Sequence, residues 1–233
     1  MSSNEDINNN EVCLYIVPVP IGNYGDMTLR AIEVLKQAPI IICEEYREAR
    51  RLLSHFGINA ELASLNEHNE AEEAAALADL ISGKGSAALI SDCGTPVFSD
   101  PGTLLIRSCV HLGIKIVTLP GANSLTTALS GCGLELDSFY FAGWLSPKKE
   151  IRRKELERLR KIREIIILMD TPYRLVQLLE AAMPVFNTNP DVVLAYQLTY
   201  PDENYFRGTL KQVLNEVSRQ KLKGEFIFII DNR

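Results

Sequence analysis

The sequence predicts an α/β fold composed of two α/β domains. Up to residue 120, short apolar runs typical of buried strands alternate with helical segments about every 25 residues, which favours a mainly parallel sheet wrapped by helices. Beyond that point, residues 138–144 alternate aromatic and small side chains and indicate a strand of a second sheet. We therefore expect a disordered tail at residues 1–11, an N-terminal domain at 12–120 and a C-terminal domain at 121–233.

The composition is typical of a globular protein with a sizeable core. Of the 233 residues, 46% are hydrophobic, and no apolar run approaches the length of a membrane-spanning helix. The polar, Asn-rich residues 1–11 have neither the basic nor the apolar region of a secretory signal. The five cysteines form no C-x-x-C pair and the three histidines are scattered. We therefore expect reduced thiols, a cytoplasmic location and no metal.

The charge is unevenly distributed along the chain. The net charge of −6 argues against a nucleic-acid partner, but residues 148–163 contain nine basic and three acidic side chains, a local sum of +6. Such a segment can attract a polyanion while the rest of the protein stays soluble. A helix rich in Lys, Arg and Glu can equally be a solvated face, and the sequence leaves both interpretations open.

The apolar pattern of the N-terminal half predicts five strands, each followed by a helix. The expected strands are residues 12–19, 40–43, 62–65, 87–90 and 115–119. The first helix begins after Asp26 or Thr28, either of which can cap it, and carries an apolar stripe. The later helices end at His55 and at Gly83, and span 104–112 and 125–129.

The loop Ser91–Gly102 is the stretch around which this half is organised. It contains two Gly and two Pro residues, which give a loop of fixed and unusual shape. Loops at the carboxyl ends of strands in α/β proteins are where ligands bind. The simpler interpretation is an ordinary turn in which Asp100 caps the next helix and Pro101 takes its first position. The cap and a ligand role for the front of the loop are compatible.

Other strand ends also carry candidate residues. The turn Pro18–Asp26 is rich in Pro and Gly but lacks G-x-G-x-x-G, so a dinucleotide site is only weakly supported. We interpret Glu44, Glu45 and Arg47 as helix caps and ion pairs in preference to a chemical role. The turn Pro120–Ser124 precedes a helix whose first amides could receive a carboxylate or another polar group.

The C-terminal half has strands and helices of less regular order. The expected strands are residues 138–144, 165–169, 192–198, 205–209 and 226–231. The expected helices are the basic segment 148–163, then 175–183 and 210–220. The segment Asp170–Arg174 follows a buried strand, at the edge where a ligand site is expected.

Several stretches taken together resemble one family. They are Val17–Asp26, Ser91–Gly102, Leu119–Gly121, Asp170–Arg174, Arg207–Leu210 and Lys223–Phe226. Their order and spacing resemble the tetrapyrrole methylase superfamily, and within it the branch that methylates a ribose 2′-hydroxyl on a cytidine of small-subunit (16S) ribosomal RNA. The resemblance covers residues 13–231. It implies a class III methyltransferase with S-adenosylmethionine in a cleft between two α/β domains, and a homodimer.

The resemblance also implies which residues contact the cofactor. They are Pro20, Asp92, Cys93, Gly94, Pro96, Val97, Phe98, Asn123, Ser124, Asp170, Thr171, Ala195, Gly224, Glu225 and Phe226. Because a ribose hydroxyl is a poor nucleophile, the reaction calls for a base or an orienting group. We take Asp170 as the catalytic candidate, with Arg174 one helical turn further on to position it or to hold a phosphate.

Three stretches depart from the ribosomal branch. That branch carries Glu-Ala-Pro-His-Arg where this chain has Asp170–Arg174, Glu-Asp-Thr-Arg at residues 44–47, and Arg-Glu-Leu-Thr-Lys at residues 196–200. Three charged side chains are thus replaced by Tyr196, Gln197 and Tyr200. These residues can form hydrogen bonds but neutralise no phosphate. The cofactor site resembles the family, and the substrate site is altered.

Three functions follow from these observations. The first is the RNA 2′-O-methyltransferase just described, with the basic segment binding the RNA backbone. The second is a methyltransferase of the same fold acting on another substrate, such as a tetrapyrrole-like small molecule, which the altered charges favour. The third is a non-catalytic module that binds S-adenosylmethionine or forms a dimer.

Overall fold

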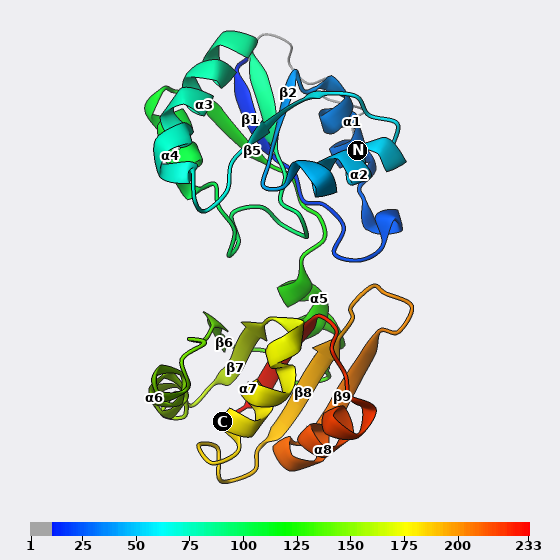
Figure 1. Cartoon of the computed structure of the whole chain (residues 1–233), viewed down its shortest axis with the longest axis vertical. Coiled ribbons are helices and arrows are strands. Elements are labelled where there is room, and N and C mark those ends of the chain that lie inside the picture. Colours follow the sequence, from blue (N-terminus) through cyan, green and yellow to red (C-terminus); the bar gives the residue numbers. More distant parts are fainter. Residues whose placement is uncertain (1–10) are drawn as a thin grey trace. The chain divides into compact units, whose positions relative to one another are not determined.

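The computed structural model describes residues 11–233, which form two compact units. The first unit ends at Asn123 and the second comprises Ser124–Arg233 (Figure 1). The tail expected at residues 1–11 lies outside the described residues, apart from Glu11. No helix in the described part of the chain is long and apolar enough to span a bilayer.

The first unit is a parallel sheet with helices between its strands. Its strands are β1 (Cys13–Ile16), β2 (Ile40–Cys43), β3 (Glu61–Ser64), β4 (Ser86–Leu89) and β5 (Lys115–Thr118). Its helices are α1 (Leu29–Gln37), α2 (Tyr46–His55), α3 (Glu70–Lys84) and α4 (Thr103–His111), with a short 3-10 turn at Tyr24–Asp26. All strand pairs are parallel, in the order β3-β2-β4-β1-β5. The expected mainly parallel sheet is therefore confirmed.

Alternate residues of β1 fill two separate cores, one on each face of this sheet. Cys13 and Tyr15 join a buried cluster with the apolar residues of α1 and α2. Leu14 and Ile16 join a second cluster with the apolar residues of α3 and α4. A strand buried on both faces reads as a continuous apolar run, which is why it is recognisable in the sequence.

The two expected helix caps in this unit have different outcomes. Thr28 caps α1, since its side-chain oxygen accepts a hydrogen bond from the backbone N–H of Ala31 at 3.1 Å. The expected Asp100 cap of α4 is wrong. The N-cap residue is Gly102, and its N–H and that of Leu104 both donate to Oε1 of Glu70, at 2.8 and 2.7 Å. A carboxylate from another helix thus satisfies the free amides of α4.

The second unit is a mixed sheet. Its strands are β6 (Phe139–Trp144), β7 (Ile165–Asp170), β8 (Asp191–Tyr196), β9 (Asn204–Thr209) and β10 (Phe226–Asp231). Its helices are α5 (Ser124–Cys132), α6 (Lys149–Leu159), α7 (Leu175–Ala182) and α8 (Leu210–Gln220), with a 3-10 turn at Pro172–Arg174. The strand order is β6-β7-β10-β8-β9, in which only the β6–β7 pair is parallel.

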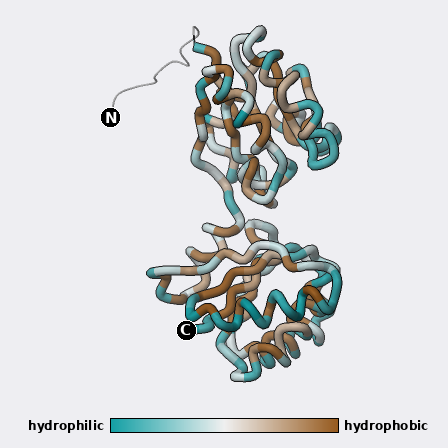
Figure 2. The backbone as a smooth tube through the Cα atoms, turned by 90° about the vertical axis from the view of Figure 1, so that its left-hand side faces the viewer, coloured by the Kyte–Doolittle hydropathy of each residue, from teal (hydrophilic) through white to brown (hydrophobic). Residues whose placement is uncertain are grey.

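Three helices cover one face of this sheet and α5 contacts the other. Apolar residues of α6, α7 and α8 form one core with alternate residues of the strands, such as Ile166, Leu168 and Phe228. On the opposite face, α5 packs against β8 and β10. Figure 2 shows the strands as mainly hydrophobic and α6, which faces the viewer, as largely hydrophilic.

Strand β1, expected at residues 12–19, is limited to Cys13–Ile16. In the second unit, α6 and β8 also end at least two residues earlier than the sequence pattern predicts. The basic helix stops at Leu159 because the chain turns there, and Asn232 Nδ2 donates to the carbonyl of Arg160 at 3.0 Å. Strand β8 stops at Tyr196 because Gln197 has a positive φ of 49° and its N–H donates to the carbonyl of Glu225 at 2.8 Å. Both ends are set by contacts with distant segments.

Candidate functional site

Three loops at the carboxyl ends of β1, β4 and β5 are joined in the first unit. Val19 pairs with Gly94 in an isolated antiparallel bridge, and the Val19 N–H donates to the Gly94 carbonyl at 2.8 Å. Thr95 Oγ1 donates to the Ala122 carbonyl at 2.9 Å. Asn123 Nδ2 donates to Thr95 Oγ1 at 3.2 Å. The first, central and third loops of the sequence prediction therefore lie side by side.

Glycines allow these loops to approach one another closely. A Cβ atom on Gly94 would lie 3.1 Å from Ile21 Cγ2, and one on Gly121 would lie 2.7 Å from Pro18 Cβ. Gly94 also has a φ of +79°, which other residues rarely adopt. The Cys93 thiol donates to the carbonyl of Ile21 at 3.5 Å, which adds a contact between the same two loops.

The central loop holds an uncommon backbone conformation. Val97, Ser99 and Gly102 all have positive φ, at 70°, 66° and 130°. A β-branched residue in this region is an outlier, and such strain persists only where the surroundings over-determine it, most often at ligand sites. The Val97 side chain packs where a Cβ on Gly102 would lie, 2.9 Å from Val97 Cγ2. The fixed shape that the sequence predicts for this loop is confirmed.

Three carboxylates near this group of loops, Glu44, Asp92 and Asp100, have raised pKa values. Burial and the charges of Asp92 and Asp100 raise the pKa of Glu44 to about 7. Burial and the charge of Asp92 raise the pKa of Asp100 to about 6. Burial also raises the pKa of Asp92 itself, with a contribution from Glu45. A cation placed here would gain from all three negative charges.

The residues at the carboxyl end of β2 differ in part from the prediction. Glu45 occupies the N-cap position of α2, but its side chain does not bond the helix, so the expected cap is wrong there. Its backbone N–H instead donates to Asp92 Oδ1 at 3.2 Å. The β2 loop is thereby tied to the central loop. Asp92, assigned to the cofactor by resemblance, has a structural contact as well.

In the second unit, the strand register brings the predicted residues to one end of the sheet. Phe226 pairs with Asp170 on one side and with Tyr196 on the other, and Ile227 pairs with Ala195. The carboxyl ends of β7 and β8 therefore adjoin the turn that begins β10 and contains Gly224 and Glu225. These residues are far apart in the sequence and neighbours in the sheet.

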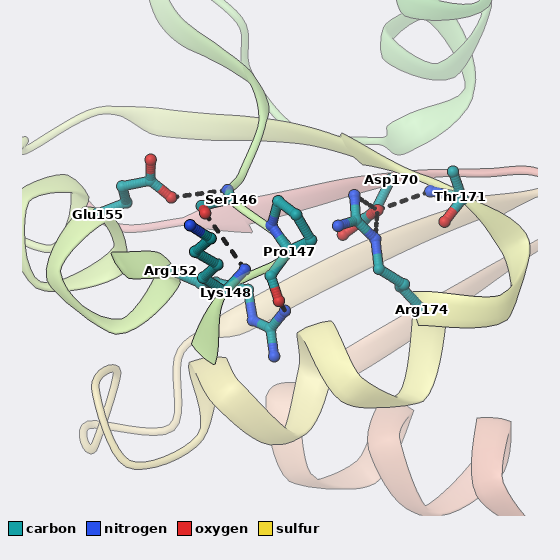
Figure 3. A network of polar contacts seen from close by, with 8 residues as sticks. All are labelled: Ser146, Pro147, Lys148, Arg152, Glu155, Asp170, Thr171 and Arg174. Atoms are coloured by element: carbon teal, nitrogen blue, oxygen red, sulfur yellow. Dashed lines mark hydrogen bonds and ion pairs between the residues drawn. The ribbon is translucent and has the colours of Figure 1, made fainter. Parts of the chain in front are cut away.

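Asp170 and Arg174 form an ion pair at this end of β7 (Figure 3). Arg174 Nε and Nη2 both contact Asp170 Oδ1, and the N–H of Thr171 donates to the same oxygen at 2.7 Å. The side chains of Asp170 and Arg174 are 1% and 13% exposed. Two buried atoms beside the pair, Asp170 Oδ2 and Thr171 Oγ1, have no partner among residues 11–233.

Two of the three replaced residues at the end of β8 pack against other parts of the second unit. Tyr196 is buried and its ring packs edge-on against Phe206, so it is not presented to a ligand as the sequence suggested. The Gln197 side chain lies over Gly224, in the space where a Cβ on that residue would be. Tyr200 is partly exposed. Of the three replaced positions, one is a core residue and one covers the turn before β10.

The cofactor residues implied by resemblance thus divide between the units. Pro20, Asp92, Cys93, Gly94, Pro96, Val97, Phe98 and Asn123 belong to the joined loops of the first unit. Ser124, Asp170, Thr171, Ala195, Gly224, Glu225 and Phe226 belong to the second. Sequence reasoning missed Glu70, which fixes the end of the central loop, and the burial of Arg152 on α6. Both are single charged residues on helices, and the apolar periodicity of a helix gives no signal for the contacts of one charged residue.

Known proteins are similar to this chain over almost its full length. A family model described as tetrapyrrole (corrin/porphyrin) methylases matches residues 13–214. Proteins named ribosomal RNA small subunit methyltransferase I are similar along almost the full length. The protein from Vibrio cholerae is 37% identical over 99% of this chain and 81% of its own length. That from Escherichia coli O157:H7 is 38% identical over 99% and 82%.

Solved structures show the same fold at low sequence identity. A cobalt precorrin-4 methyltransferase superposes with a TM-score of 0.68 at 18% identity, covering 97% of this chain and 98% of its own. A diphthine synthase gives 0.69 at 14% identity, covering 94% and 88%. The Thermus thermophilus uroporphyrin-III C-methyltransferase complexed with S-adenosylhomocysteine gives 0.63 at 15% identity, covering 94% and 96%.

These likenesses agree with the joined loops of the first unit and the strand-end residues of the second. The chain belongs to the tetrapyrrole methylase family, in the group represented by the ribosomal RNA small subunit methyltransferases I.

Proposed function

We propose that this protein is an S-adenosylmethionine-dependent methyltransferase that modifies the ribose 2′-hydroxyl of a cytidine in small-subunit ribosomal RNA. The names of its relatives support the substrate class. The observation that carries the proposal is the group of three strand-end loops, which are joined through Gly94 and Thr95. Binding and orientation are what such a site has to supply, since the cofactor carries the reactive methyl group.

Residues in each of the two units fit this cofactor. A sulfonium is a cation, and Glu44, Asp92 and Asp100 place negative charge at the group of loops. Gly94 keeps the backbone open where a side chain would collide with Ile21. The buried Asp170 Oδ2 and Thr171 Oγ1 have hydrogen-bonding capacity left over for a polar ligand. When bound, S-adenosylmethionine would supply an activated methyl group.

The acceptor side of the reaction concerns Asp170 and Arg174. In a 2′-O-methylation the ribose oxygen bonds to the methyl carbon, the methyl–sulfur bond breaks and the hydroxyl proton has to leave. We assign the proton to Asp170 Oδ2, the oxygen that Arg174 and Thr171 leave free. This atom is buried in the structure, so the step requires that RNA binding exposes it. Arg174 positions the carboxylate through the ion pair.

The test is methylation mapping of small-subunit ribosomal RNA. Mass mapping and primer extension are carried out on RNA from a strain lacking the gene, and the same strain complemented with the wild-type chain or with Asp170→Asn. The expected result is one cytidine that loses its 2′-O-methyl group, regains it with the wild type and stays unmethylated with the variant. Unchanged ribosomal RNA methylation in the deletion strain would overturn the proposal.

A second function is favoured by one observation. Tyr196 is part of the core and Gln197 covers Gly224, so the segment that departs from the ribosomal branch is an integrated feature. It would suit a methyltransferase with another acceptor, such as a tetrapyrrole-like small molecule. Incubation of the purified protein with labelled S-adenosylmethionine and either unmodified ribosomal RNA or uroporphyrinogen separates the two. Binding of the cofactor in calorimetry without turnover on either would support the non-catalytic module.

The assembly and location are part of the same proposal. We infer a homodimer in the cytoplasm, without a membrane or metal partner, as the family resemblance implies. Among the described residues, no group of three or more His, Cys, Asp or Glu side chains could hold a metal ion. Light scattering coupled to size-exclusion chromatography tests the dimer, and a monomer across the micromolar range would contradict it.

A further inference from the structure

The second unit contains a basic groove between α6 and α7 that the proposed reaction does not use. Its volume is about 1360 Å³. Six cationic side chains line it: Lys149, Arg152, Arg153, Arg160, Lys161 and Arg163. Three carboxylates also line it, Glu150, Glu157 and Glu180. The wall therefore has a formal excess of three positive charges, in a chain whose net charge is −6.

Arg152 is the unusual member of this set. It is 6% exposed, and its guanidinium makes one hydrogen bond, from Nη1 to the carbonyl of Pro147 at 3.3 Å (Figure 3). Its buried Nε has no partner among the described residues. By contrast, Arg174 of the same unit, whose side chain is 13% exposed, is ion-paired with Asp170. Burial of a guanidinium without a carboxylate partner costs free energy unless another anion binds to it.

The chemistry of the groove fits phosphate. A guanidinium presents five N–H donors in a planar fork that matches the oxygens of a phosphate, and Arg152 uses one of them. Arg153 lies one residue further along the helix and is paired with the exposed carboxylate of Glu157 at 2.9 Å. Exchange of that solvent-exposed partner for a phosphate costs little, because exposed ion pairs contribute little to stability.

The length of the groove fits a chain of phosphates better than a single one. Lys149 and Arg160 lie at opposite ends of α6, about 16 Å apart at the helical rise of 1.5 Å per residue. Lys161 and Arg163, in the segment between α6 and β7, also line the groove. Several consecutive phosphates of one nucleic-acid strand fall within that distance.

We propose that the groove between α6 and α7 binds the sugar–phosphate backbone of the RNA substrate at a distance from the methylated nucleotide, with Arg152 as its buried phosphate ligand. This inference rests on the proposed function, in which RNA is the substrate and therefore the polyanion that the groove would bind. It assigns the basic segment 148–163 to substrate binding instead of a solvated face.

The experiment compares two charge-reversed variants of the full chain. Lys161→Glu/Arg163→Glu changes exposed residues of the groove. Lys211→Glu/Lys221→Glu makes the same change in charge outside it, at exposed residues on α8 and at its C-cap. Binding of a fluorescein-labelled fragment of unmodified small-subunit ribosomal RNA is measured by anisotropy over a range of salt. We expect the groove variant to lose about 10- to 100-fold in affinity. We also expect its slope of log K against log salt to be shallower by about 1.4, at about 0.7 per lost phosphate contact.

Arg152→Met tests the buried ligand separately. Because the native charge is uncompensated, we expect the melting temperature to stay at or above that of the wild type while RNA affinity falls. S-adenosylmethionine affinity, measured by calorimetry, should be unchanged in all of these variants. A lower melting temperature with unchanged RNA affinity would show that Arg152 is structural and would overturn its assignment.

The outcomes distinguish this inference from the proposed function. If wild-type protein methylates ribosomal RNA and the groove and α8 variants bind it equally well, the groove assignment is wrong and the reaction stands. If poly-glutamate displaces the RNA as effectively as unlabelled RNA does, the groove accepts an acidic protein segment instead. If the wild type binds RNA through the groove but transfers no methyl group to it, the reaction fails and the groove assignment survives.

Discussion

The two units hold their candidate residues by different means. Residues 1–123 carry 16 acidic and 8 basic side chains, a formal charge of −8, and residues 124–233 carry 14 acidic and 16 basic, a charge of +2. In the first unit, backbone contacts and glycines shape the site, as at Gly94 and Gly102. In the second, charge marks two separate places: the Asp170–Arg174 ion pair at the end of β7, and the buried guanidinium of Arg152 in the groove between α6 and α7. The difference supports a division in which the first unit supplies negative charge to the cationic donor and the second supplies positive charge to the anionic acceptor, while both contribute residues to the cofactor.

If charge organises the second unit, the loss of one partner of the buried pair should have the largest effect. Asp170→Ala leaves Arg174 without its carboxylate in a site where that side chain is 13% exposed. Removing one partner of a buried pair typically costs about 3–5 kcal/mol. We expect the free energy of unfolding in urea to fall by that amount.

The matched control is the pair Asp231–Arg233 at the chain end of the same unit, where both side chains are more exposed. Asp231→Ala should cost less than about 1 kcal/mol. Equal losses from both substitutions would show that Asp170 is no more important to the fold than an exposed carboxylate.

If backbone shape organises the first unit, Gly102→Ala should have the next largest effect. The added Cβ would lie 2.9 Å from both Leu89 Cδ2 and Val97 Cγ2, at a φ of +130°. Overpacking of this kind costs about 1–3 kcal/mol. Because Val97 would have to move, we also expect weaker S-adenosylmethionine binding in calorimetry.

Gly57→Ala separates the steric clash from the conformational cost of a positive φ. Gly57 has a φ of +63°, but nothing lies within 4 Å of an added Cβ. That variant should show only the conformational cost, about 1–2 kcal/mol, and unchanged cofactor affinity. A loss of cofactor affinity in Gly57→Ala, or its absence in Gly102→Ala, would contradict the role given to the central loop.

Glu70 tests how firmly the central loop is fixed at its far end. Glu70→Ala removes the acceptor of the Gly102 and Leu104 amides, and the loss of a helix cap typically costs about 1 kcal/mol. Hydrogen exchange at the start of α4 should accelerate. Glu73→Ala, also in the first turn of α3 and exposed, is the control that should leave this exchange unchanged.

The sequence predicted the elements whose information is local. The strand Ile40–Cys43 and the helix Leu210–Gln220 have the predicted bounds. A strand buried on both faces is a continuous apolar run, and a helix buried along one stripe has apolar residues at helical spacing, so neighbouring residues reveal both. The Pro- and Gly-rich loops were identified because those residues restrict the backbone directly. Resemblance then supplied the cofactor residues, which spacing alone could not.

The features that the sequence did not predict depend on distant partners. Glu70 caps a helix that begins more than 30 residues later, so Asp100, adjacent to that helix, was the natural but wrong choice. Arg152 is one of several cations on α6, and nothing in the sequence distinguishes it as the buried one. Gln197 ends β8 by a bond to Glu225, which joins the strand only in the folded sheet. Tertiary contacts decide these positions, and no single-sequence pattern reports them.

The smallest expected effect is a pH dependence of stability that arises from the acidic residues near the joined loops of the first unit. Because the pKa of Glu44 is raised from 4.5 to about 7, the folded state binds its proton more tightly than the unfolded state does. This contribution to stability is complete below about pH 4.5 and is lost as the pH rises through 7. Solvent screening of this partly exposed group keeps it below about 1 kcal/mol.

Cofactor binding should show the opposite dependence on pH. As Glu44 and Asp100 lose their protons between about pH 6 and 8, the site becomes more negative, and affinity for a sulfonium cation should rise by a few-fold. Glu44→Gln should remove most of this rise and leave the affinity at pH 6 nearly unchanged, since Glu44 is largely protonated there. Calorimetry at several pH values measures both. A wild-type affinity independent of pH would mean that these carboxylates shape the loops without facing the cation, and that the first unit binds its ligand through backbone alone.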